Sequence, residues 1–156
     1  MEGAQMHMLV NHFPILGVFF GAFILLGGVF FKKLDIVKTG LFVLIFSGIM
    51  ALPAYFSGEE AEEVVEEMGI SHDIIHEHEE QAETVIWLVE ILALLSIGGL
   101  IILRKSTERY RLIGLSLASL ALVTFAFLAQ VGHSGGLINH PELRENKQVE
   151  NTIDED

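Results

Sequence analysis

The feature that most constrains the fold of this chain is a set of four apolar stretches. They cover residues 8–31, 36–56, 84–103 and 112–131. Only His12, Lys38 and Glu90 interrupt these stretches with a charged or imidazole side chain. A helix needs about 20 apolar residues to cross a hydrocarbon layer about 30 Å thick, so each stretch is long enough to span a membrane.

A backbone inside lipid has no water to bond with, so it must form helices or a closed barrel. Stretches of about 20 residues fit helices and are longer than membrane strands. We therefore predict an all-α fold, a four-helix transmembrane bundle with up-and-down connections and a helical extramembrane connection between spans two and three. Residues 1–141 would form this membrane domain, and the polar, acid-rich residues 142–156 a flexible tail.

The charges differ between the connections, and this asymmetry predicts an orientation. The connection at residues 57–83 has eleven acidic residues and no Lys or Arg. The first and third connections are flanked by seven of the nine basic residues: Lys32, Lys33, Lys38, Arg104, Lys105, Arg109 and Arg111. The positive-inside rule then places these two connections in the cytoplasm and both termini outside. We expect a multi-pass protein of the bacterial inner membrane. The four spans make the lipid bilayer an expected partner, and the net charge of −12 argues against nucleic acid as a partner.

The histidines of the chain gather on the same predicted outer side. All seven lie near the chain start, in the second connection, or after the fourth stretch: His7, His12, His72, His76, His78, His133 and His140. The chain has no cysteine, which excludes c-type haem attachment, thiolate zinc sites and cysteine-ligated iron–sulfur clusters. Imidazoles and carboxylates gathered at one face indicate a metal or a metallo-cofactor there.

The second connection carries helix signals of its own. Ser57 and Glu60 have the spacing of a capping box, and Gly69 can end the helix that would follow. Ser71 can cap a second helix that continues into the third stretch. At helical spacing this helix has one polar stripe: His72, His76, Glu79, Glu83, Trp87 and Glu90. A carboxylate inside a membrane, as Glu90 would be, indicates a proton path, an ion site or a ligand contact, or else a protonated group with one interhelical hydrogen bond.

The fourth stretch ends in glycines that flank a histidine. Gly132, Gly135 and Gly136 surround His133, and His140 follows. Glycine allows close approach of the backbone to a ligand, and it also ends helices in tight turns. Both interpretations stay open from the sequence.

These two chain ends carry a resemblance. The opening His-x4-His-Phe-Pro and the ending Gly-x-x-Gly-Gly with a following histidine resemble a family of uncharacterised four-helix bacterial membrane proteins. The matching residues are His7, His12, Phe13, Pro14, Gly132, Gly135, Gly136 and His140. Some members of that family are joined to Rieske domains, so the resemblance implies a bundle and redox work.

Three hypotheses for function follow. In the first, the chain is a b-type haem protein that carries electrons at the outer face, with His12 and His133 as iron ligands and Gly132, Gly135 and Gly136 beside the ring. In the second, a non-haem Fe, Zn or Cu ion is bound by some of these residues: His12, His76, His78, His133, His140, Glu79, Glu83 and Glu90. In the third, the chain is a cofactor-free subunit of a larger respiratory or transport complex. No motif supports an enzyme.

Overall fold

The computed structural model describes residues 2–140, so the predicted tail at residues 142–156 lies outside the described part. Every element in that part is helical, and the elements are α1 (Glu2–Val10), α2 (His12–Phe30), α3 (Leu34–Glu67), α4 (His72–Lys105), the short 3₁₀ helix η1 (Thr107–Arg109) and α5 (Tyr110–Asn139). Four helical segments are long and apolar enough to cross a membrane, with α1 and α2 together forming the first. The predicted all-α, four-helix, multi-pass membrane fold is confirmed.

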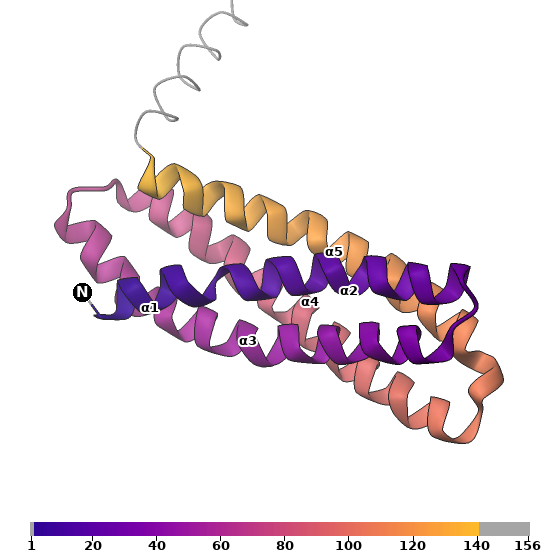
Figure 1. Ribbon diagram of the computed structural model, residues 1–156. Coiled ribbons are helices and arrows are strands. Elements are labelled where there is room, and N and C mark those ends of the chain that lie inside the picture. The colour runs from indigo at the N-terminus through magenta and orange to yellow at the C-terminus, as the bar shows by residue number, and fades with distance from the viewer. Residues whose placement is uncertain (1, 141–156) are drawn as a thin grey trace, which may run out of the picture.

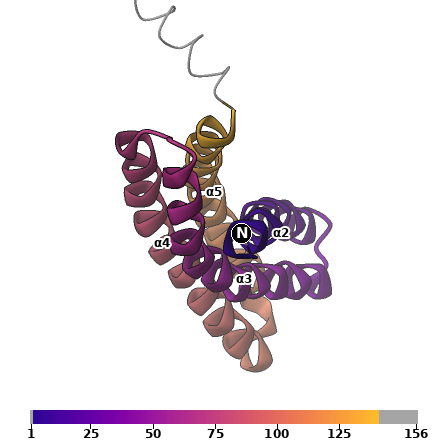
Figure 2. The same cartoon turned by 90° about the vertical axis from the view of Figure 1, so that its left-hand side faces the viewer.

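The four long helices pack as a closed bundle. Helix α2 packs against α3 and α5, and α4 packs against the same two helices (Figures 1 and 2). Figure 1 shows the N-terminus, the α3–α4 connection and the last turn of α5 at one end of the bundle. This is the histidine end, to which His7, His12, His72, His76, His78, His133 and His140 belong. The α2–α3 and α4–α5 connections form the opposite end, which we call the lysine end.

Burial follows the pattern of a protein whose solvent is lipid. The interior is filled by fully buried aliphatic side chains such as Leu25, Leu41 and Leu92. Large apolar side chains also cover the outside; Leu94, for example, is 65% exposed. Three buried hydroxyl groups, those of Ser47, Ser96 and Thr124, each donate a hydrogen bond to a carbonyl one turn back in their own helix. The apolar middle of the bundle therefore satisfies these polar groups locally.

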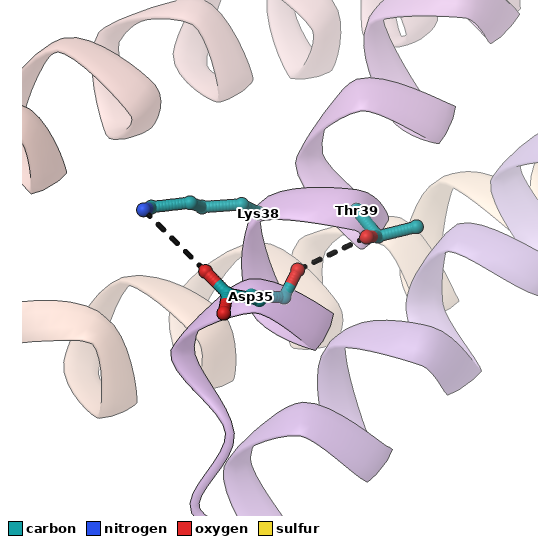
Figure 3. Close-up of polar contacts among 3 residues, drawn as sticks. All are labelled: Asp35, Lys38 and Thr39. Atoms are coloured by element: carbon teal, nitrogen blue, oxygen red, sulfur yellow. Dashed lines mark hydrogen bonds and ion pairs between the residues drawn. The ribbon is translucent and has the colours of Figure 1, made fainter.

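A small polar cluster lies at the start of α3, at the lysine end of the bundle (Figure 3). The Lys38 ammonium lies 3.7 Å from the Asp35 carboxylate, and the Thr39 hydroxyl donates to the Asp35 carbonyl oxygen at 3.0 Å. Asp35 lies in the first turn of α3, where a negative charge interacts favourably with the helix dipole. Lys32 takes a positive φ of 55° in the preceding turn.

Helices α3 and α5 both continue past the helix ends that the sequence patterns predicted. Helix α3 runs for 34 residues, or about 50 Å, well beyond the thickness of a hydrocarbon layer. The predicted capping box is therefore wrong: Ser57 lies inside α3 and donates to the Ala54 carbonyl oxygen at 3.1 Å. A serine within a helix can bond back in this way, and the Glu-rich residues after it favour continued helix.

The breaks that the structure does contain are short. Gly69 lies just after the end of α3 and has a φ of +83°, so the predicted helix end at this glycine is confirmed. Ser71 precedes α4 as its N-cap residue, as predicted, but its side chain makes no capping hydrogen bond. Helix α5 continues through Gly132, Gly135 and Gly136 to Asn139, so the alternative of a helix end and turn at these glycines is wrong.

A pair of adjacent glycines tests how closely α2 and α3 approach at the lysine end. A Cβ atom on Gly28 would lie 2.6 Å from the backbone nitrogen of Val37, whereas one on Gly27 would meet nothing within 4 Å. Gly28→Ala should lower the free energy of unfolding by about 1–3 kcal/mol through overpacking. Gly27→Ala should be neutral or slightly stabilising, because alanine favours helix. Thermal unfolding in detergent measures both, and equal effects would contradict the close approach.

Candidate metal site

The hairpin formed by the end of α3 and the start of α4 brings three potential metal ligands together. Glu62 and Glu66 are four residues apart and therefore lie on one face of α3. The turn at Gly69 then reverses the chain and places His72, the first residue of α4, beside them. One ligand atom from each side chain lies within 4.8 Å of the others. We call these three residues the hairpin cluster.

Glu79 borders the hairpin cluster from the next turns of α4. It shares a side-chain hydrogen bond with Glu62. Partial burial, the hydrogen bond to Glu62 and the charge of Glu62 raise the pKa of Glu79 to about 7, against the smaller opposing effect of His76 and His72. The Glu79 carboxyl group therefore loses its proton at a higher pH than an ordinary carboxyl group does.

Within residues 2–140 the acidic groups of the hairpin have no Lys or Arg beside them. The sequence has no Lys or Arg between Lys38 and Arg104, and both of these lie toward the lysine end. Imidazole nitrogens are the nearest partners in this region: His76 Nδ1 lies 3.9 Å from Glu79, and His76 Nε2 lies 3.5 Å from Glu80. Among the described residues, negative charges therefore accumulate here without a fixed countercharge, an arrangement that favours binding of a cation from solution.

The structure brings part of the predicted polar stripe together. The His72 and His76 rings lie 6.0 Å apart between centroids, and His76 contacts Glu79. Glu83 is exposed one turn further along α4. Glu90 is separate from this group: its carboxylate lies beside Gly48 of α3, and its Oε1 atom is buried with no hydrogen-bond partner in the described part of the chain.

Two other histidines are partly buried within the bundle end. His7 contacts α3, where its Nδ1 atom lies 2.9 Å from the Ala54 carbonyl oxygen and 3.3 Å from the Ser57 hydroxyl. His78 contacts α5, where its Nδ1 atom lies 3.0 Å from the Ser134 hydroxyl. Burial lowers the pKa of His78, and the charge that His7 would carry lowers it further, while a hydrogen bond to the Val131 carbonyl raises it.

The predicted haem ligands lie on the outside of the bundle. His12 and His133 are both exposed. Their helices are neighbours at this point, since a Cβ atom on Gly132 of α5 would lie 3.4 Å from Ile15 of α2. Of the glycines proposed to face a porphyrin, Gly135 lies against the His78 ring, while a Cβ atom on Gly136 would meet nothing within 4 Å. Iron ligation by His12 and His133 stays a prediction, as does metal binding by His140.

Sequence reasoning missed three residues that the structure brings into these contacts. Glu62 and Glu66 had a usable signal, since they are spaced four apart immediately before a glycine turn and a histidine. They were not singled out because the helix here has acidic residues on all of its faces. His7 had no comparable signal, because its partners Ala54 and Ser57 are 47 and 50 residues away in the chain.

Comparison with protein-family models, with curated proteins and with solved structures found no match to this chain. The candidate sites therefore rest on the geometry described above.

The raised pKa of Glu79 predicts a pH-dependent stability. A carboxyl group with a folded-state pKa of about 7 and an ordinary value of 4.5 binds its proton more tightly in the folded chain. Stability from this group should thus be greatest below about pH 4.5 and should fall as the pH rises toward 7. Glu79→Gln should remove this contribution, which thermal unfolding in detergent between pH 4.5 and 8 can measure.

The quantity to compare is the difference in stability between wild type and Glu79→Gln at each pH. The lowered pKa of His78 gives a slope of the opposite sign below its ordinary value of 6.5, and this slope is common to both. Parallel curves for wild type and Glu79→Gln would show that Glu79 titrates as an ordinary carboxyl group.

Proposed function

We propose that this protein is a multi-pass membrane protein that binds a divalent transition-metal ion at the hairpin cluster. The observation that carries the proposal is the convergence of Glu62, Glu66 and His72 from two helices, with ligand atoms within 4.8 Å of one another. One imidazole and two carboxylates form a mixed nitrogen and oxygen donor set, which suits Zn²⁺ or Fe²⁺ better than Mg²⁺ or Ca²⁺.

The neighbouring Glu79 supports this proposal as a fourth ligand or as a proton acceptor. Glu79 is hydrogen-bonded to Glu62, so a cation that binds Glu62 would displace the proton of this bond. Metal affinity would then rise with pH across the range near 7 in which Glu79 loses its proton. The cation would also relieve the repulsion among carboxylates that have no Lys or Arg beside them within residues 2–140.

Binding of Zn²⁺ to the purified chain tests the proposal, and the acidic run offers matched controls. Glu62→Gln and Glu66→Gln should each lower the affinity at least about tenfold, since outer-shell changes alone cost 10–100-fold. Glu63→Gln and Glu67→Gln change the net charge equally, but both side chains are exposed and lie outside the hairpin cluster. Isothermal titration at two pH values measures affinity and proton release together. An equal loss in all four variants would mean nonspecific attraction and would overturn the site.

The side of the membrane on which the metal would be bound follows from charge. The seven basic residues near the lysine end support a cytoplasmic location for that end. The hairpin cluster would then face the periplasm or the cell exterior.

Reporter fusions test this orientation. A reporter that is active only in the cytoplasm should be silent when fused after Asp156 and active when inserted after Lys33. The reverse pattern would place the metal site in the cytosol.

A further inference from the structure

The histidine end contains a second group of potential ligands, which goes beyond the proposed metal site of the hairpin. It consists of His7 on α1 and His78 on α4, two partly exposed side chains that are hydrogen-bonded to α3 and α5, respectively. The two rings are close enough for a charge on His7 to lower the pKa of His78. They share no residue with the hairpin cluster.

The hydrogen bonds of His7 determine which ring nitrogen carries its proton. The Ala54 carbonyl oxygen can only accept, so His7 Nδ1, at 2.9 Å from it, must donate. The Ser57 hydroxyl also donates to Ala54, which leaves its oxygen free to accept from the same His7 N–H. The lone pair of the neutral ring is therefore on Nε2, the atom that would bind a metal.

The same reasoning applies to His78. When the Ser134 hydroxyl donates to Gln81 Oε1 at 2.9 Å or to the Val131 carbonyl at 3.0 Å, its oxygen is free to accept from His78 Nδ1 at 3.0 Å. Metal-binding histidines characteristically donate their second ring nitrogen to an oxygen in this way, which fixes the tautomer and the ring orientation. The hydrogen bonds of His7 have this outer-shell arrangement, and those of His78 are compatible with it.

A third polar atom at this end is left without a partner. Asn11 Oδ1 is buried and accepts no hydrogen bond within residues 2–140. The Asn11 backbone nitrogen bonds to the His7 carbonyl oxygen at 2.9 Å, so the two residues lie one helical turn apart on one face. An unsatisfied buried amide oxygen is costly, and a ligand or a metal-bound water at this face would satisfy it.

We propose that His7 and His78 form a two-imidazole site for a transition-metal centre, either a free ion or the iron of a porphyrin. The shared chemistry is coordination by two neutral Nε2 atoms from different helices. In this arrangement Ser57 and Ser134 are positioning residues that act through the rings, and Gly135 provides the space that the His78 ring occupies. A Cβ atom on Gly135 would lie 3.1 Å from His78 Cε1.

The test uses the full chain carrying Glu62→Gln and Glu66→Gln, so that binding at the hairpin cluster is not counted. Zn²⁺ binding is measured by equilibrium dialysis, and haemin binding by the Soret band. We expect one of the two probes to bind once per chain. His7→Ala or His78→Ala should then lower that affinity at least about tenfold, whereas a loss in His133→Ala alone would favour the predicted His12–His133 ligand pair instead. A Soret shift without Zn²⁺ binding identifies porphyrin iron, and the converse identifies a free ion.

Adjacent glycines keep the test decisive if the histidine variants fail to fold. Gly135→Ala crowds the His78 ring and should weaken binding, while Gly136→Ala makes the same change where a Cβ atom meets nothing within 4 Å. Binding of neither probe to the background protein would overturn the proposal. So would binding that is unchanged in His7→Ala and His78→Ala, or that is equal in the two glycine variants. The hairpin proposal is unaffected by these outcomes, because its own ligands are absent from the protein under test.

Discussion

The requirement that every backbone N–H and C=O group in lipid be satisfied within its own segment governs this structure. It explains why α3 continues through Pro53, a residue that usually ends or kinks a helix. Breaking the helix inside its apolar stretch would expose backbone groups that have no water to bind, and each such group costs several kcal/mol.

Because the helices extend past the membrane, the chain can build a polar structure on an apolar scaffold. The apolar parts of α3 and α4 fix the two helices relative to each other, and their charged extensions meet at the turn around Gly69. The hairpin cluster therefore owes its geometry to packing of residues such as Leu41, Leu44 and Leu92 in the interior. Side chains that repel one another are kept close by contacts elsewhere in the fold, a common condition of functional sites.

The number and type of helices could be predicted from the sequence because lipid imposes a simple pattern of length and composition. Helix limits were harder to predict: the signals at Ser57 and at the glycines of α5 are derived from water-soluble helices, and here they were outweighed. The site was predicted only at the level of its location at one end. Spacing along α4 correctly grouped His72, His76 and Glu79. Contacts between helices, such as those of His7 with Ala54 or His78 with Ser134, depend on helix rotation and were not predictable from periodicity.

The lengths of α3 and α4 have a mechanical consequence. Each is a 34-residue helix that links the hairpin to the lysine end without a break. A helix resists bending along most of its length. A change in the distance between α3 and α4 at the hairpin therefore changes the angle between the two helices and moves their ends at the lysine end. Helix α4 has no proline, whereas α3 lacks one backbone N–H at Pro53. Bending is therefore expected to concentrate there, next to the Ala54 carbonyl that His7 holds, which makes this turn the natural pivot of the bundle.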